Sequence, residues 1–108
     1  MRTVNQQTPS AYTPTAPPSV TIGATSAQIL AAATTGKTRT VLRIQNTHAT
    51  QKLWIREDGG TAAATAGGAH LMLGPGQGWD WAYSVPQGVI TGISDGAATI
   101  VAVLVVEV

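Results

Sequence analysis

Hydrophobic and polar residues alternate most clearly over residues 40–56. Apolar side chains recur at every second position on both sides of a short polar stretch, residues 46–51. This alternation predicts two strands that each point one row of side chains inward, and the polar stretch predicts a hairpin turn between them. The predicted inward rows are Leu42, Ile44 and Asn46 in the first strand and Leu53 and Ile55 in the second.

Turn signals divide most of the remaining chain into short segments. Glycine, proline and aspartate cluster in the sequences EDGG, GPGQG, VPQG and DG, which predict turns. The segment 26–33 fits a strand or a helical turn, of which we prefer the strand, and residues 61–68 fit a surface loop that could hold one helical turn. About eight short strands at a spacing of roughly ten residues predict an all-β fold, either an antiparallel β-sandwich or a small barrel. Beyond the alternating pair, we expect strands at residues 20–22, 26–33, 69–73, 79–83, 89–94 and 99–108.

The last predicted strand, residues 99–108, carries apolar side chains on both faces. A strand in an antiparallel sheet usually has one face in contact with water. Either both faces are covered within the fold, or another subunit buries the outer one. We predict burial at an oligomer interface or under a loop, because an exposed run of this kind promotes aggregation. One row is Ile100, Ala102, Leu104 and Val106, and the other, which we assign to the interface, is Val101, Val103 and Val105.

Residues 1–18 differ in composition from the rest and predict an extended arm ahead of a β-sandwich domain at residues 19–108. The arm holds four of the six prolines and a single charge, Arg2. Proline fixes the dihedral angle φ and has no amide hydrogen, so neither a regular helix nor a central strand is expected. Two interpretations stay open: a disordered tail, or an arm that lies on a neighbouring subunit with Tyr12 as its anchor.

The low charge of the chain narrows the classes of partner. Charged residues make up 10% of the sequence and the net charge is +1, so we expect no binding to nucleic acid or to an anionic membrane. No apolar run reaches the roughly 18 residues of a membrane-spanning helix. The absence of cysteine excludes a disulfide framework, a thiolate zinc site and a cysteine nucleophile.

The titratable residues predict neither a catalytic site nor a cofactor site. His48 lies in a predicted turn and His70 in a predicted strand, and no serine stands in a glycine-flanked elbow. The histidines and the five carboxylates lack ligand spacings such as HxH or DxDxDG, so we expect neither a metal nor another cofactor. We therefore predict that the protein is not an enzyme.

Basic residues and one tryptophan supply the candidate partner contacts in the middle of the chain. Arg39 and Arg43 are predicted to share a strand face that could meet an acidic patch on a partner. Trp54 has Arg56 on its own face, opposite the predicted inward row, so we expect both at an interface.

A second set of aromatic residues, Trp79, Trp81 and Tyr83, recurs at a spacing of two and therefore shares one face of a predicted strand. We predict that this row fills the core, because the chain contains no phenylalanine and the core needs bulk. The alternative is an aromatic platform for a sugar or a partner protein.

Eight short segments of the β domain form a series with a known counterpart. They are VTIG at residues 20–23, QIL at 28–30, RTVLRIQN at 39–46, LWIR at 53–56, GGTAA at 59–63, GPG at 74–76, VPQG at 85–88, and the valine-rich end at 90–106. The series resembles the small β-rich structural proteins of tailed bacteriophages, which serve as capsid decoration (cement) proteins or as other virion accessories. These motifs are structural rather than catalytic, and the proline-rich arm lies outside the pattern.

The resemblance implies a virion protein of the capsid surface, made in the host cytoplasm, that binds the major capsid protein and stabilises the head. It also implies a homo-oligomer, with a trimer as the expected state because three-fold sites commonly seat decoration proteins. The same fold could instead serve as an adaptor in the neck, tail or fibre. A third hypothesis, from the residues alone, is a carbohydrate-binding module that uses Trp79 and Trp81.

Overall fold

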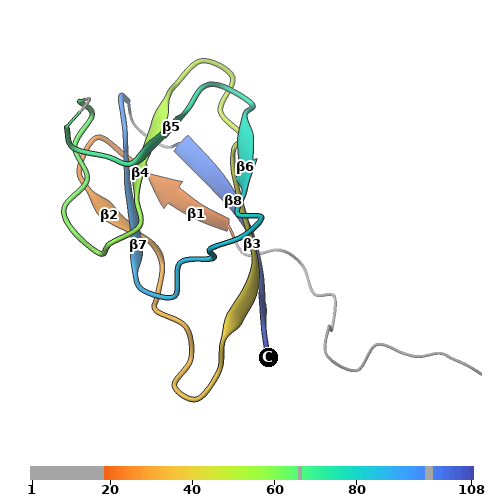
Figure 1. Ribbon diagram of the computed structural model, residues 1–108. Helices are drawn as coiled ribbons and strands as arrows, with labels where there is room; N and C mark the ends of the chain where they lie inside the picture. Colours follow the sequence, from red (N-terminus) through yellow and green to blue (C-terminus); the bar gives the residue numbers. More distant parts are fainter. Residues whose placement is uncertain (1–18, 66, 97–98) are drawn as a thin grey trace, which may run out of the picture.

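The computed structural model describes residues 19–65, 67–96 and 99–108, which form two four-stranded antiparallel sheets (Figure 1). The predicted all-β sandwich is confirmed, and the segment 26–33 contains a strand rather than a helical turn. The predicted arm, including Tyr12, lies outside the described residues. The strands are β1 (Ser19–Ile22), β2 (Ala27–Leu30), β3 (Arg39–Asn46), β4 (Leu53–Arg56), β5 (Leu71–Leu73), β6 (Gly78–Asp80), β7 (Ile90–Ser94) and β8 (Thr99–Glu107).

The strand order is β1-β8-β3-β6 in one sheet and β2-β7-β4-β5 in the other. The strands pair in a nested series, β1 with β8, β2 with β7, β3 with β6 and β4 with β5, and every pair is antiparallel. Such a series is one long ribbon folded over on itself. The pairings of β3 with β8 and of β4 with β7 then join the folded ribbon into two sheets. This arrangement is a jelly roll, an eight-stranded double sheet.

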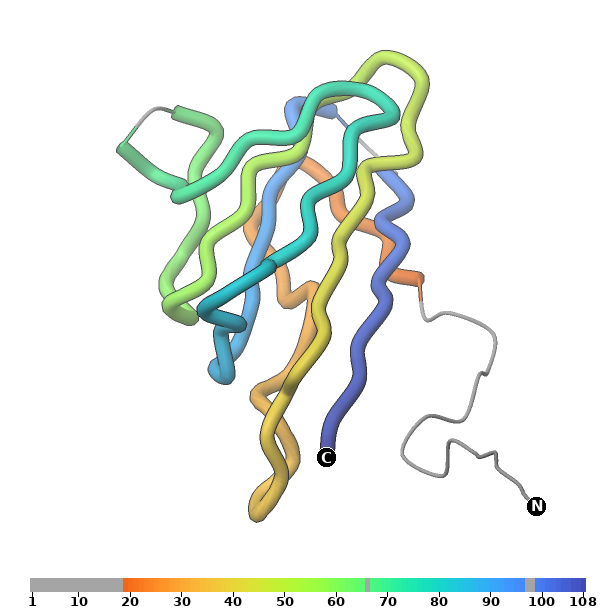
Figure 2. Tube along the Cα trace, turned by 45° about the vertical axis from the view of Figure 1, so that its right-hand side comes forward, coloured from red at the N-terminus to blue at the C-terminus, as the bar shows by residue number. Residues whose placement is uncertain are grey.

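The hairpin predicted for residues 40–56 is wrong, although both of its strands exist. β3 pairs with β8 and β6, whereas β4 pairs with β5 and β7 in the opposite sheet. Figure 2 shows β3 running beside β8, while the chain crosses to the other layer before β4. Alternation fixes which side chains point inward, but it carries no information on which strand lies alongside. The inward rows of β3 and β4 therefore face each other across the core.

The core lies between the two sheets and is built from the inward rows of the strands. Burying an aliphatic side chain of this size is worth about 1.5–3 kcal/mol, so these rows hold the sheets together. The turn after β5 requires glycine at Gly76, where φ is +75°. The buried core side chains are Ile22, Ile29, Leu42, Ile44, Leu53, Ile55, Leu73, Ile90, Val101 and Val103.

The assignment of Val101 and Val103 to a partner interface is therefore wrong. Their side chains are 0% and 1% exposed, and they pack in the core opposite the second sheet. Val105 continues the same inward row and is half-buried against the core. The two apolar rows of β8 look alike in sequence, and only the sheet packing decides that the even-numbered row faces outward.

Arg39 was also predicted on a partner-facing surface, and the structure places it inside instead. The register of β3 against β8 shifts between Arg39 and Val41, so one extra residue is inserted at this point of the strand. The shift reverses the alternation, and Arg39 turns inward while Arg43 stays outward. The Arg39 side chain is 1% exposed.

Buried Arg39 fastens two connections of the sandwich to β3. Its Nη2 donates to the carbonyl of Ala31, 2.7 Å away, and its Nη1 donates to the carbonyls of Pro86 and Gly88. The amide of Gln87 closes the arrangement, because its side chain both donates to and accepts from the backbone of Arg39 at 2.7 Å. Burial lowers the pKa of Arg39 from its ordinary value, partly opposed by the charge of Glu107.

Candidate interaction surfaces

The outer face of the β1-β8-β3-β6 sheet carries an apolar strip along β8 and β3, which we call the β8 face. Three of its large apolar side chains are well exposed: Ile100 at 51%, Val41 at 42% and Leu104 at 36%. A shallow hollow of about 170 Å³ lies over the strip. The residues of the β8 face are Val41, Arg43, Gln45, Ile100, Ala102 and Leu104.

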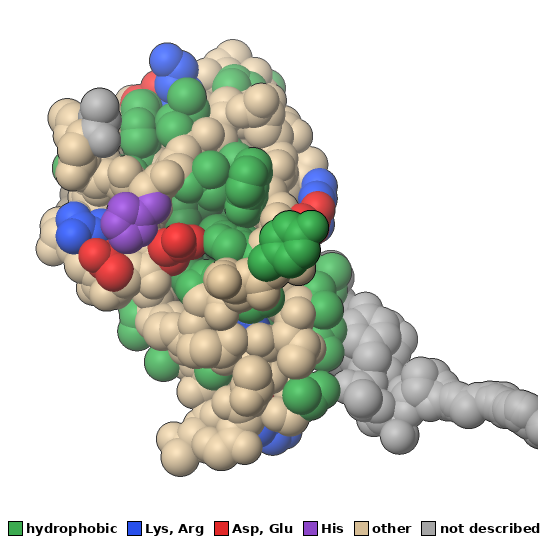
Figure 3. All heavy atoms as spheres, viewed as in Figure 1, with side chains coloured by type: hydrophobic (Ala, Val, Ile, Leu, Met, Phe, Trp, Pro, Cys, Tyr) green, Lys and Arg blue, Asp and Glu red, His purple; other side chains and the backbone are tan. Residues whose placement is uncertain are grey.

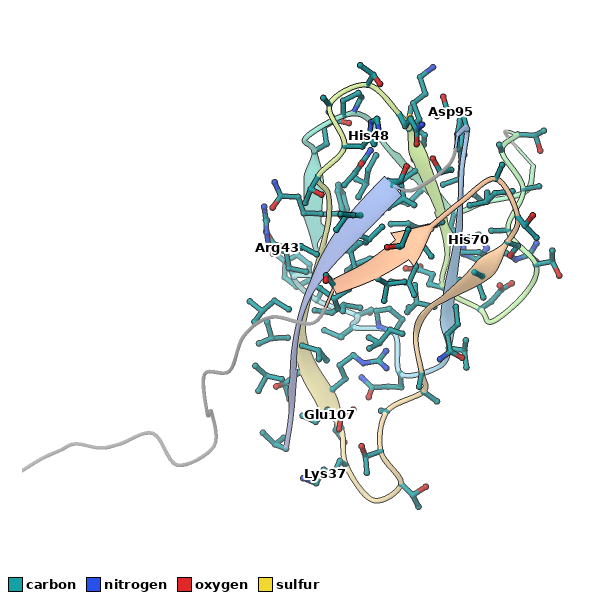
Figure 4. All side chains as sticks on the ribbon, turned by 180° about the vertical axis from the view of Figure 1, so that it is seen from behind. Lys37, Arg43, His48, His70, Asp95 and Glu107 are labelled. Carbon is teal, nitrogen blue, oxygen red and sulfur yellow. The ribbon has the colours of Figure 1, made fainter. Side chains whose placement is uncertain are left out.

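Polar contacts border the β8 face on its β6 side. Arg43 Nη1 lies 2.7 Å from Asp80 Oδ2, and both side chains are partly exposed to solvent. Gln45 Nε2 donates to the carbonyl of Gly76 at 3.3 Å. The single cation of the face is therefore paired within the chain, so the face presents little net charge to a partner. Figure 4 shows Arg43 on this side of the sheet, away from Lys37 and Glu107.

The outer face of the second sheet holds the other predicted contacts, Trp54 and Arg56. Trp54 is half-buried between its cross-strand neighbours, Met72 on β5 and Ile93 on β7. Arg56 is bound to Asp58 through Nε and Nη2, at 2.7 and 3.0 Å. These bonds, with the backbone amide of Gly60 at 3.0 Å, hold the pKa of the Asp58 carboxyl well below its ordinary value. Arg56 therefore stabilises the loop that directly follows β4.

The predicted burial of Trp79, Trp81 and Tyr83 in the core is wrong for two of the three. β6 is the edge strand of its sheet, so Trp79, which stands opposite inward Ile44, lies at the rim of the core, and Tyr83 lies beyond the end of the strand. Trp79 is 48% exposed and Tyr83 is 97% exposed, whereas Trp81 packs against the core. Trp81 Nε1 donates to Glu57 Oε2 at 2.7 Å.

These residues form an aromatic corner where β5 and β6, the edge strands of the two sheets, approach each other. One hollow, about 190 Å³, is lined by Glu57, His70, Leu71, Trp79 and Trp81. A second, about 450 Å³, is lined by residues 79–84. The space-filling view of this side shows hydrophobic side chains gathered beside a histidine and acidic groups (Figure 3).

His48 organises the connection between the two sheets. Its Nδ1 accepts hydrogen bonds from the backbone amides of Thr50 and Gln51, both at 3.0 Å. Asn46 is fully buried and donates to the carbonyls of Gln51 and Leu73 at 2.7 and 3.2 Å. These contacts give His48 a structural role in the turn.

His70, the second histidine, precedes β5 and lies beside acidic residues. Its Nε2 is 3.9 Å from Asp58 Oδ2, and its Nδ1 accepts from the amide of Glu57 at 3.5 Å. Among residues 19–65, 67–96 and 99–108, no group of three or more histidine, aspartate or glutamate side chains is arranged to hold a metal ion.

The predicted contact residues do not come together at one place. Arg43 lies on the β8 face, Trp54 and Arg56 lie on the opposite outer face, and Arg39 is inside. Sequence reasoning missed exposed Val41, and the row of β8 that it selected is the buried one. The sequence signal for this face is that both rows of β8 are apolar. That signal predicts that the outward row is covered by something, but it does not say which of the two rows faces outward.

Comparisons of the chain with known protein families, with curated proteins and with solved structures found no match. In the part of the chain that the structure describes, no helix has the length and apolar character needed to span a membrane.

Proposed function

We propose that this chain is a structural protein of a bacteriophage virion, a capsid decoration protein that binds the major capsid protein and stabilises the head. The observation that carries the proposal is the β8 face, where exposed Val41, Leu104 and Ile100 lie along one side of the sheet with little net charge. Exposed apolar patches of this kind mark contact surfaces, since leaving them in water is unfavourable. The resemblance of the sequence segments to small phage structural proteins supplies the class of partner.

The mechanism of such a protein is mechanical. Each copy places its β8 face on a capsid subunit, and the apolar side chains are removed from water at the contact. Because a shell offers many equivalent positions, a modest affinity at each contact is enough when one assembly engages several subunits at once. The sandwich supplies a rigid support, since β8 is fixed by β3 along its length and by the inward row beneath it.

Locating the protein in the particle is the direct test. Cryo-electron microscopy of the phage that encodes the chain should show the jelly roll on the outer surface of the head. Density in the neck, tail or fibre would overturn the decoration role and favour the adaptor.

Two matched substitutions test which face makes the contact. Ile100 and Met72 are exposed to similar extents, 51% and 46%, and lie on opposite outer faces of the sandwich. Ile100→Lys places a charge in the proposed contact and should weaken binding to capsids by at least about tenfold, a step of roughly 1.4 kcal/mol. Met72→Lys should bind as the unsubstituted protein does. Equal binding by both variants in a cosedimentation assay would contradict the use of this face.

A second candidate function, saccharide binding, is favoured by the aromatic corner. The hollow of about 450 Å³ has exposed Trp79 and Tyr83 in its wall, with polar groups from Asp80 and Ser84 beside them. Aromatic faces pack against the apolar faces of sugar rings, and neighbouring polar groups fix the orientation of a ligand. Binding on a glycan array that is lost in Trp79→Ala would establish this function, and an empty array would remove it.

A further inference from the structure

β8 is paired on both sides over only part of its length. On one side it pairs with β3 from Val101, opposite Asn46, to Glu107, opposite Arg39. On the other side it pairs with β1, and this ladder stops where Ala102 meets Ser19. Figure 4 shows β1 beside the first part of β8, while the rest of β8 runs on towards Glu107.

The backbone groups of Val103, Val105 and Glu107 point to this unpaired side. In an antiparallel ladder, the N–H and C=O of alternate residues point in the same direction. The carbonyl of Ile100 accepts from the amide of Thr47, and Val108 exchanges two bonds with Thr38, so the even-numbered residues point to β3. The odd-numbered residues therefore point to an edge that no strand in residues 19–65, 67–96 or 99–108 covers beyond Ala102.

This open edge lacks the features that usually keep sheet edges from pairing. By contrast, the strands at the outer positions of the two sheets are short, with only three or four residues each; they are β1, β2, β5 and β6. The open part of β8 reads VLVVE and contains no proline, glycine or lysine. Short edges, prolines and lysines protect natural sheets, and an unprotected edge of this composition pairs readily with another strand.

The chain's own preceding residues are poorly suited to cover the edge by continuing β1. A ladder continued past Ser19 would place Pro18 opposite Val103 and Pro14 opposite Glu107. Proline has no amide hydrogen to donate, so the carbonyls of both β8 residues would stay without a donor. A strand from outside the chain can supply the donor that Glu107 would lack.

We propose that the strand which completes this edge is β8 of a second copy, paired antiparallel about a two-fold axis at Val106. Val106 then lies opposite Val106 of the second copy, Val105 lies opposite Glu107, and the paired segment ends at Leu104, clear of Ser19. The two pairs of Val105 with Glu107 each exchange N–H and C=O bonds, which joins the two β1-β8-β3-β6 sheets into one continuous sheet.

The side chains suit a symmetric contact of this kind. A two-fold interface brings each surface against itself, so a charge near the axis would meet a like charge. The outward residues nearest the axis, Leu104 and Val106, are apolar, and Val106 of one copy meets Val106 of the other while Leu104 meets Val108. Glu107 is already engaged, because its Oε2 accepts from the amide of Thr34 at 3.2 Å. A two-fold axis closes at a dimer, unlike the trimer expected from the resemblance, and the inference stands independently of the capsid role.

Two neighbouring proline substitutions test the pairing. Val105→Pro removes an amide that points to the open edge, whereas Val106→Pro removes one that points to β3. In sedimentation equilibrium the unsubstituted protein should be a dimer. Val105→Pro should raise the dissociation constant at least about tenfold, because two symmetric donors are lost, while thermal melting shows the fold retained. Val106→Pro should instead lower the melting temperature, because it breaks a bond to β3. An unsubstituted protein that is monomeric at all concentrations, or a Val105→Pro variant that dimerises unchanged, would overturn the proposal.

Amide hydrogen exchange of the intact protein gives a second reading if Val105→Pro fails to fold. The amides of Val105 and Glu107 should become more protected as protein concentration rises, whereas the amides of Leu104 and Val106 should be protected at every concentration. Fast exchange of Val105 at all concentrations would refute pairing of the edge. Protection that is independent of concentration and disappears when residues 2–18 are deleted would show that the chain covers its own edge, and would equally refute it.

Discussion

Arg39 gives the sharpest test of how the sandwich is held together. Arg39→Met keeps a long apolar stem in the buried space but removes the hydrogen bonds to the connections before β3 and before β7. The bonds to Ala31 and Pro86 carry most of the effect, since the bond to Gly88 is long, at 3.3 Å. Arg39 Nε has no partner among the described residues, so it adds nothing to offset the cost of burial.

The magnitude follows from these contacts. Hydrogen bonds from charged donors are worth about 1.5–3 kcal/mol each, and we take the lower end because removing the guanidinium also removes its desolvation cost. Two such bonds give a loss of about 3 kcal/mol in the free energy of unfolding. For a domain of this size the melting temperature should fall by roughly 12 °C or more.

Urea unfolding and thermal melting, followed by circular dichroism, measure the effect against a control on the same strand. Arg43→Met removes the exposed ion pair with Asp80 and should change the free energy of unfolding by about 1 kcal/mol or less. If Arg39→Met were no more destabilising than Arg43→Met, the buried hydrogen bonds would contribute nothing net, and the role given to Arg39 would be wrong.

Three further predictions concern other parts of the molecule. His48→Ala should cost about 1–2 kcal/mol of stability, because two backbone amides lose their acceptor, while His70→Ala should melt close to the unsubstituted protein. Neither substitution should impair capsid binding, and a folded variant that no longer binds would reveal a missed site. Hydrogen bonding from Thr34, with smaller effects of nearby positive charges, lowers the pKa of Glu107 in the folded state. The Glu107 carboxylate therefore stabilises the fold at pH values above the ordinary carboxyl pKa, and this stabilisation is lost as pH falls through the lowered pKa of the folded state. Glu107→Gln should flatten the acid side of a plot of melting temperature against pH. An unchanged slope would contradict this assignment. Deletion of residues 2–18 should leave thermal melting unchanged and reduce capsid occupancy. Equal occupancy would mean that the segment is only a tail, and loss of folding would mean that the segment contains a strand.

The strands of this fold could be predicted from sequence because their signal is local. Alternation around Leu42 and Leu53 and the glycine and proline turns depend on residues that are close together in the chain. The pairing of strands depends on residues far apart, so β3 and β4 were predicted as neighbours although they lie in different sheets.

The predictions of partner-contact residues were wrong for related physical reasons. The shifted register after Arg39 reverses the parity of one residue, which no pattern in the sequence marks. β8 is apolar on both faces, so hydrophobicity cannot tell Val103, which is buried, from Leu104, which is exposed. The prediction for the aromatic row was wrong because β6 is an edge strand, which leaves Trp79 at the rim of the core, and because the strand ends before Tyr83.

The nested pairing of the eight strands has a consequence for how the chain folds. Residues joined by the outermost pair, such as Val20 and Val101, are far apart in sequence, and direct closure of so long a loop is slow. The innermost pair joins Ile55 to Leu71, a much shorter loop. Once β4 and β5 have met, β3 and β6 are already close, and each later pair closes only a short additional segment. Folding can therefore proceed as a zipper from the middle of the chain outward, which leaves β1 and the edge of β8 as the last parts to form and the first to open.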